Sequence, residues 1–236
     1  YGGTCINVGC IPTKKLVNLS KEAQYVNNNV AGEYFTLSIE KKDALVSALR
    51  AKNFAMLDGN ANIDVINGTA KFIDKNSVEV AAVDGSKSVL TAPTIVINTG
   101  SVNEKPSFEV SSNSAYDSTG ILNLKTLPKH LVVVGGGYIG LEFASMFAEF
   151  GSKVTVIARS GVLKNEDDDV KESVKSLLQT QGIDILEGCE VKNLKDCALI
   201  FNQNGETKCL EADAFLLATG RVAASAELNL SAAGVQ

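Results

Sequence analysis

The sequence predicts an α/β protein, and three of its patterns carry that prediction: alternating strands and helices, a glycine-rich turn, and a run of short β-branched segments. After Pro128, apolar strand-like stretches alternate with segments of helical period, which is typical of a parallel sheet covered by helices. Upstream, two helical segments lead into short strands separated by turn residues. With 236 residues, 45% of them hydrophobic, the chain can form one large domain or two of ordinary size.

The first half of the chain predicts two helices followed by strands. Pro12 suits the first turn of a helix, and residues 13–27 have helical periodicity, so Cys10 falls at a helix N-terminus. Residues 40–58 form a second expected helix that ends at Asp58-Gly59. Turn residues then separate four expected strands, at 63–66, 69–73, 77–83 and 88–97.

Strands and helices alternate in the second half. The expected order is strand 131–135, helix 138–150, strand 153–158, helix 167–181, strand 183–186, short strands, and a last strand 214–218. Asn165 is placed to cap the second of these helices, and the acidic residues after it occupy the first turn, where the helix dipole favours negative charge. Residues 101–127 contain Pro, Ser and Asn with little periodicity, so they are expected to connect two domains.

Composition excludes several classes of partner. The 22 basic and 27 acidic residues give a net charge of −5, and no basic stripe interleaves with aromatic residues, so a nucleic-acid partner is not expected. Apolar runs such as 131–134 are too short to span a bilayer, and no signal-peptide pattern opens the chain, which indicates a cytoplasmic protein. Because Tyr1 already belongs to a motif, an upstream segment is expected to be missing.

A glycine-rich turn joins strand 131–135 to helix 138–150. The run Gly135-Gly136-Gly137-Tyr138-Ile139-Gly140 is GxGxxG, and a second strand follows its helix, which meets the conditions of the βαβ dinucleotide-binding fingerprint. Gly135 is expected to make the tight turn, Gly137 to let the backbone approach a pyrophosphate, and Gly140 to let helix and strand pack closely. The helix N-terminus would then hold the phosphates.

The end of strand 153–158 indicates which dinucleotide is preferred. An NAD-selective protein is expected to place an acidic residue there, against the ribose 2′-hydroxyl. Here the strand is followed by Arg159 and Ser160, with Lys164 shortly after, and a guanidinium at this position suits a 2′-phosphate. NADPH is therefore predicted, with NAD possible; the alternative is that Arg159 is a solvated loop residue.

Two of the five cysteines, Cys5 and Cys10, lie in a glycine-rich motif at a helix start. In a regular helix their Cα atoms would be about 8.6 Å apart, beyond the range that a disulfide bridges, so the turn must be distorted, which Gly9 permits. The helix start would stabilise a thiolate at Cys10, and no second ligand pair is spaced for zinc, so redox catalysis is the expected role. The other cysteines are expected to be small buried hydrophobes: Cys189, Cys197 and Cys209.

The motif GGTCINVGCIPTK at residues 2–14 resembles the signature of the class I pyridine nucleotide-disulfide oxidoreductases, a family that includes glutathione reductase, lipoamide dehydrogenase and mercuric reductase. Three further motifs occur in family order, at Asn98-Thr99-Gly100-Ser101, GGGYIGLE 135–142 and Ala218-Thr219-Gly220-Arg221. The resemblance covers essentially the whole chain, and the run 157–160 is most similar to mercuric reductase and its bacterial homologues.

The fold that this resemblance implies is a Rossmann-type NAD(P)-binding domain inserted in a partial FAD-binding α/β domain with a β-meander. The implied divisions are a partial FAD-binding domain with the redox disulfide helix at 1–102, a connection at 103–127, the NAD(P)-binding domain at 128–225, and the start of the return to the FAD domain at 226–236. The family's FAD fingerprint would lie upstream, and its dimerisation domain, with an acid–base His-Glu pair, downstream. The complete protein is expected to be a homodimer, and this piece alone is expected to be inactive.

The resemblance also implies roles for individual residues. Electrons would pass from NAD(P)H through FAD to the cysteine pair, with Cys10 facing the flavin and Cys5 attacking the substrate. Lys14 would approach the flavin and pair with Glu142, and Tyr138 would cover the nicotinamide pocket. FAD would be contacted by Gly3, Thr4, Lys14, Ala70, Thr99 and Gly100, and the dinucleotide by Gly135, Gly137, Tyr138, Ile139, Gly140, Glu142, Arg159, Ser160, Lys164, Val191 and Gly220.

The electron acceptor implied by the family is a small-molecule disulfide. Two alternatives remain open at the level of sequence. The acceptor of the same enzyme could instead be Hg(II) or an oxidant such as hypothiocyanite. The chain could also be a non-catalytic nucleotide-binding module in which the cysteines are structural.

Overall fold

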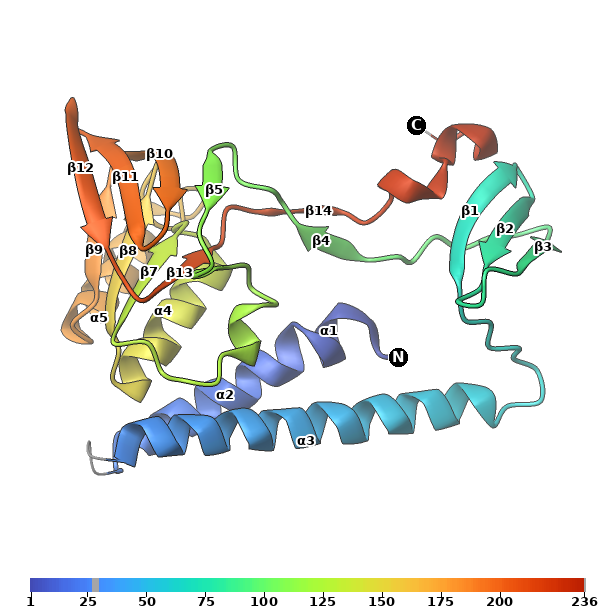
Figure 1. Cartoon of the computed structure of the whole chain (residues 1–236), viewed down its shortest axis with the longest axis horizontal. Helices are drawn as coiled ribbons and strands as arrows, with labels where there is room; N and C mark the ends of the chain where they lie inside the picture. The colour runs from blue at the N-terminus through green and yellow to red at the C-terminus, as the bar shows by residue number, and fades with distance from the viewer. Residues whose placement is uncertain (27–29, 236) are drawn as a thin grey trace.

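The computed structural model describes residues 1–26 and 30–235 and has a mixed α/β architecture, as the sequence predicts (Figure 1). One end holds a parallel sheet with its helices, and the other end holds a small antiparallel sheet (Figure 1). The long helix α3 (Ala31–Asp58) runs from the first end towards the second (Figure 1). Within the described residues, no helix is both long enough and apolar enough to cross a membrane.

Five parallel strands form the main sheet, in the order β6-β13-β7-β8-β9. Their bounds are β6 (Ala115–Tyr116), β13 (Ala214–Leu217), β7 (His130–Val134), β8 (Lys153–Ala158) and β9 (Asp184–Glu187). Helix α4 (Tyr138–Phe150) connects β7 to β8, and α5 (Asp168–Thr180) connects β8 to β9. Strands β7 and β8 are buried along almost their whole length because other layers cover both faces of the sheet. The predicted parallel α/β arrangement is confirmed.

A second sheet covers one face of the parallel sheet. Its order is β12-β11-β10-β5, with β5 (Glu109–Ser111), β10 (Cys189–Lys195), β11 (Ala198–Gln203) and β12 (Glu206–Glu211). Leu194, Leu199 and Phe201 from this sheet form one buried cluster with Val132 and Phe215 of the parallel sheet. On the opposite face, α4 packs between the sheet and the helices of the first half, so the core has helical and strand layers on either side of the parallel strands.

Residues 101–127, expected as an irregular connection, contain three short strands and a 3₁₀ helix. Strand β4 (Ser101–Asn103) pairs with β14 (Arg221–Ala223), β5 joins β10, and β6 joins β13. The 3₁₀ helix η2 (Ile121–Asn123) contributes the buried residues Ile121 and Leu122. The prediction missed these strands because segments of two or three residues carry no readable period and are formed by distant partners.

Helix α1 (Gly3–Asn7) and helix α2 (Cys10–Ala23) are separated by a break at Val8 and Gly9, so α2 begins at Cys10 rather than at residue 13. It ends at Ala23, and residue 27, the expected end, lies outside the described residues. Helix α3 begins at Ala31 instead of residue 40. Phe35 explains the difference, because it is fully buried and packs edge-on against Phe150 of α4 with ring centroids 5.2 Å apart.

The meander of the first half consists of β1 (Thr69–Asp74), β2 (Ser77–Ala81) and β3 (Lys87–Thr91). The predicted strand at 63–66 does not form, and the predicted strand 88–97 ends at Thr91, two residues before Pro93. A strand without a pairing partner is not stable, and Ile66 and Val96 in these segments are exposed. The C-terminal 3₁₀ helices η3 (Ala226–Leu228) and η4 (Leu230–Ala233) lie beside β1, where Asn229 donates to the Phe72 carbonyl at 2.9 Å; residue 236 lies outside the described residues.

Two smaller predictions are wrong. The N-cap of α5 is Asp167 rather than Asn165, although Asp168 and Asp169 do occupy the first turn. Cys189 is buried as expected, whereas Cys197 and Cys209 are exposed. Cys197 lies in the turn between β10 and β11, and Cys209 lies on the edge strand β12, so neither position is covered by a further layer.

Candidate nucleotide-binding and redox site

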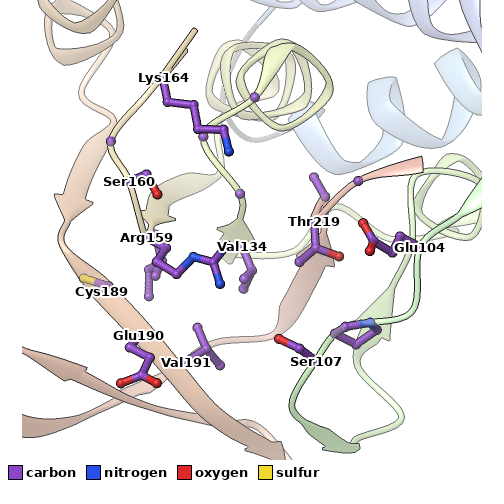
Figure 2. A pocket seen from close by; sticks show the side chains of 18 of the residues that line it. Glu104, Ser107, Val134, Arg159, Ser160, Lys164, Cys189, Glu190, Val191 and Thr219 are labelled. Atoms are coloured by element: carbon purple, nitrogen blue, oxygen red, sulfur yellow. The ribbon is translucent and has the colours of Figure 1, made fainter. Parts of the chain in front are cut away.

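A cavity of about 770 Å³ opens at the carboxyl ends of β7, β8 and β13 (Figure 2). Its size is typical of small-molecule sites, which measure roughly 300–1,000 Å³. Most of the residues predicted to contact a dinucleotide line it: Gly135, Gly137, Tyr138, Arg159, Ser160, Lys164, Val191 and Gly220. The remaining three, Ile139, Gly140 and Glu142, lie along α4 beyond the lining.

The glycine turn between β7 and α4 shows why each glycine is needed. Gly135 has φ 127°, and a Cβ there would overlap the carbonyl oxygen of Ala218. A Cβ on Gly140 would overlap the carbonyl oxygen of Gly135, so helix and turn pack in direct contact. A Cβ on Gly137 would meet nothing within 4 Å, and Gly137 caps α4 without any side-chain hydrogen bond. The turn is therefore open at Gly137, next to the start of α4, and the first N–H groups of a helix have no partner within the helix, which suits a pyrophosphate.

Two of the four basic residues that line the cavity, Arg159 and Lys164, belong to the loop after β8; the other two are Lys105 and Lys192. Figure 2 shows the side chains of Arg159 and Lys164 directed into it. The loop folds back onto the glycine turn, because the Leu163 N–H donates to the Gly136 carbonyl at 2.8 Å. A smaller cavity of about 460 Å³ adjoins the same loop and is lined by Arg159, Ser160, Gly161, Val162, Lys164, Lys171, Glu172, Lys175, Glu187 and Gly188.

Tyr138 lines the cavity at the first residue of α4. The residue is 68% exposed, and its hydroxyl donates a hydrogen bond to the carboxylate of Glu166. Because only the protonated phenol can donate this hydrogen bond, the bond raises the pKa of Tyr138. Tyr138 is thus held at the edge of the cavity by a residue from the loop that also carries Lys164.

Residues 104–108 form a wall of the cavity that the sequence analysis missed. Glu104 and Ser107 face the cavity from this wall, near Thr219 (Figure 2). The Glu104 carboxylate occupies the space that a side chain at Gly220 would need, and the Glu104 N–H donates to the Gly220 carbonyl at 3.0 Å. The pairing of β4 with β14 brings these distant segments together, and no local pattern in the sequence could have shown it.

The two cysteines of the motif lie on either side of the break between α1 and α2. Cys5 belongs to α1, Cys10 is the first residue of α2, and both carry exposed free thiols. A Cβ on Gly9 would lie 3.0 Å from the Thr4 carbonyl oxygen, so the distorted turn depends on glycine. Interaction with the Cys10 thiol raises the pKa of Cys5, and backbone N–H groups of Cys10 and Ile11 oppose that rise. The two cysteines therefore flank the turn that precedes α2.

An ion pair joins α2, the helix that begins at Cys10, to α4. Lys14 Nζ of α2 donates to Glu142 Oε1 of α4, which is the pairing that the family resemblance implies. The hydrogen bond and the charge of Glu142 raise the pKa of Lys14, and Cys10 adds to the effect. The buried Ser20 Oγ donates to Glu149 Oε2 at 2.6 Å and makes a second link between the same helices.

The residues expected to contact FAD are partly brought together. Gly100 and Thr4 are adjacent, since a Cβ on Gly100 would lie 3.5 Å from Thr4 Oγ1. Gly3 and Thr99 are their chain neighbours, and Gly100 has φ 73°. Ala70 lies on β1 of the meander, paired with Val80. The apposed Gly3-Thr4 and Thr99-Gly100 segments, beside the Cys10 helix, fit one side of a flavin site.

A parallel sheet with a glycine-rich βαβ turn, a large cavity at its carboxyl edge and a neighbouring helix with an exposed dithiol define a nucleotide-binding redox protein. The chain belongs to the pyridine nucleotide-disulphide oxidoreductase family, whose model matches residues 1–236. This family consists of flavoproteins that bind FAD and a pyridine nucleotide.

Comparison with individual proteins agrees with this assignment. The chain is 43% identical over 238 residues to the probable pyridine nucleotide-disulfide oxidoreductase RclA of Escherichia coli (strain K12), covering 100% of this chain and 52% of that protein. It is 39% identical to a mercuric reductase of Lysinibacillus sphaericus, covering 100% of this chain and 45% of that protein. The solved Cu(II) complex of the HOCl-induced flavoprotein disulfide reductase RclA from Escherichia coli superposes with a TM-score of 0.89 at 40% identity, covering 100% and 52% of the two chains. The chain spans about half the length of the curated relatives it matches.

Proposed function

We propose that this chain is the central part of a homodimeric, cytoplasmic flavoenzyme that uses NADPH to reduce a small-molecule disulfide or a related soft electrophile. The observation that carries the proposal is the Lys14–Glu142 ion pair. It fixes the helix that bears Cys10 to α4, and the N-terminus of α4 opens the nucleotide cavity. The dithiol and the nucleotide cavity therefore lie on two helices that are in direct contact.

The proposed reaction transfers two electrons from NADPH to a disulfide. One S–S bond breaks and two thiols form, while NADPH and one proton are consumed and NADP⁺ is released. When bound, FAD supplies the two-electron relay between the nicotinamide and the cysteines. In this scheme the family resemblance assigns Cys10 as the thiol that faces the flavin and Cys5 as the thiol that exchanges with the substrate. The two residues lie on either side of the break between α1 and α2.

Support for NADPH over NADH comes from the loop after β8. Arg159 and Lys164 line the cavity where the adenosine ribose of a Rossmann-bound dinucleotide lies, and Ser160 offers a hydroxyl beside them. The guanidinium suits a 2′-phosphate, and the strand carries no acidic residue at its end to bind a 2′-hydroxyl. NADH is the alternative substrate that the test must distinguish.

The acceptor is proposed only as a class. The exposed Cys5 thiol suits a small disulfide or oxidant. One relative is a mercuric reductase, and another is described as HOCl-induced, so Hg(II) and a reactive oxidant such as hypothiocyanite are the acceptors to assay beside disulfides.

The test is an anaerobic titration of the complete protein with NADPH and with NADH, followed through the flavin spectrum. We expect a long-wavelength band from a thiolate–flavin contact at lower NADPH than NADH, and its loss in Cys10→Ser. Cys197→Ser, at an exposed cysteine far along the chain, is the matched control and should keep the band. Flavin that bleaches without the band would refute the disulfide mechanism, and a protein that purifies without flavin would favour the non-catalytic alternative.

A further inference from the structure

Glu187 is a carboxylate that lies one strand away from the expected position of a ribose-binding acid. It ends β9, whereas the acid of an NAD-selective protein would end β8. Its Oε1 accepts the Val162 N–H at 3.1 Å, and its Oε2 accepts Lys175 Nζ at 2.6 Å. The Lys175 ammonium is the main cause of a lowered pKa at Glu187, so the residue is ionised at neutral pH. Both oxygens are engaged by groups of the protein.

The Val162 N–H belongs to the loop that carries Arg159 and Lys164. Gly161 in this loop has φ 83°, and a Cβ there would lie 3.1 Å from Glu187 Oε1. The next residue along, Leu163, donates its N–H to the Gly136 carbonyl at 2.8 Å. The loop is therefore fixed at adjacent residues, on one side to Glu187 and on the other to the glycine turn.

The charges around the smaller cavity also depend on Glu187. Four cationic side chains line this cavity, Arg159, Lys164, Lys171 and Lys175, together with the acidic Glu172 and Glu187. An unpaired carboxylate beside Arg159 would repel a phosphate. Because Lys175 and the Val162 N–H both bind Glu187, the charge of Glu187 is balanced within the protein. The side chains of Arg159 and Lys164 are directed into the larger cavity (Figure 2).

We propose that Glu187 is a positioning residue that holds the loop of Arg159 and Lys164 in the shape that binds the 2′-phosphate of the dinucleotide. This inference rests on the NADPH preference proposed above. Glu187 acts through the Val162 backbone and does not contact the ligand. Its carboxylate binds the backbone of this loop, and the 2′-phosphate on the ribose is bound by Arg159 and Lys164.

The proposal is tested on the complete protein with Glu187→Ala, Glu187→Gln and the control Asp184→Asn, which alters an exposed carboxylate at the opposite end of β9. Two ligands are compared by calorimetry, 2′,5′-ADP and 5′-AMP, which differ by the 2′-phosphate. In Glu187→Ala we expect binding of 2′,5′-ADP to weaken on the order of tenfold, as for loss of charge-assisted hydrogen bonds, and binding of 5′-AMP to change less than about twofold. Glu187→Gln keeps an acceptor for Val162 and should retain most of the affinity.

Amide hydrogen exchange at Val162 provides a readout that needs no ligand. Exchange should accelerate by at least about tenfold in Glu187→Ala and change little in Asp184→Asn. Equal weakening of the binding of both ligands in Glu187→Ala would mean a merely structural role and would overturn the proposal. If the wild type prefers 2′,5′-ADP, unchanged exchange at Val162 in Glu187→Ala would also overturn it. A wild type that binds both ligands alike would instead refute the NADPH preference itself, and the phosphate-directed role of Glu187 with it.

Discussion

At the scale of single residues, the site depends on partners that are far apart in the chain. Lys14 and Glu142 are separated by 128 positions, and each residue by itself looks like an ordinary charged surface residue. The motifs at 2–14 and 135–142 predicted their pairing through family resemblance. Glu104 and Glu187 belong to no such motif, and their positions followed only from the folded chain.

The first prediction concerns the pH dependence of the Lys14–Glu142 pair. The pKa of Lys14 is raised above its ordinary 10.5, so the stabilisation is fully present below that value and is lost as pH rises through the higher folded-state pKa. Glu142→Gln should reduce the free energy of unfolding by at most about 1 kcal/mol near pH 8, since the Lys14 side chain is largely exposed. Urea denaturation of wild type and variant from pH 8 to 11 measures this.

The difference between the two proteins should shrink towards pH 11. Glu33→Gln, at an exposed carboxylate on α3, is the control and should show no such trend. A difference that stays constant across the whole pH series would show that Glu142 acts through packing and not through its charge.

At the scale of elements, local sequence set the position of the glycine turn, whereas packing against distant segments set where helix α3 begins. The turn between β7 and α4 formed where GxGxxG predicted it, and a Cβ on Gly135 or Gly140 would overlap backbone atoms of the same unit. Helix α3 extends nine residues further towards the N-terminus than expected, from Ala31, because Phe35 and Ile39 are buried against other helices. The segment 63–66 has the residues of a strand but no partner within the described chain, so propensity alone did not form one.

The second prediction separates the structural from the ligand-directed glycines of that turn. Gly140→Ala should lower the free energy of unfolding by about 1–3 kcal/mol, because the new methyl overlaps the Gly135 carbonyl. Gly137→Ala should leave it within about 0.5 kcal/mol, since nothing lies within 4 Å of the new Cβ. NADP⁺ binding should nevertheless fall in Gly137→Ala, because the methyl fills the space facing the start of α4.

Guanidinium denaturation and equilibrium dialysis with NADP⁺, carried out on both variants, measure the two effects. The result that would contradict the assignment is the reverse pattern, in which Gly137→Ala unfolds readily while Gly140→Ala is as stable as the wild type.

At the scale of the whole molecule, helix α3 and the paired strands β4 and β14 connect its two ends (Figure 1). Arg221 holds the strand pair together. Its guanidinium donates to Ser101 Oγ at 2.9 Å, to the Ser101 carbonyl at 2.6 Å and to Asn103 Oδ1 at 2.7 Å. Because Glu104 follows β4 directly, the same strand pair sets the wall of the nucleotide cavity.

The third prediction is that Arg221→Met opens this connection. Loss of three hydrogen bonds should increase the rate of proteolysis within 99–104 and 221–225 by roughly tenfold and weaken NADP⁺ binding. Arg221→Lys, which keeps the charge but not the planar fork, should lie between wild type and Arg221→Met. Limited proteolysis with mass spectrometry measures the cleavage sites, and an unchanged digestion pattern would show that other contacts hold the two strands.

The sequence by itself determined the parallel α/β unit, the glycine turn, the cysteine motif at a helix start, and the family. These features depend on residues that are neighbours in the chain, whose spacing directly sets the local backbone. Only the tertiary structure decided the wall at residues 104–108, the pairing of β4 with β14, the early start of α3 and the position of Glu187. Each of these arises when segments far apart in the chain pack together, and contacts of that kind leave no period or motif in either segment.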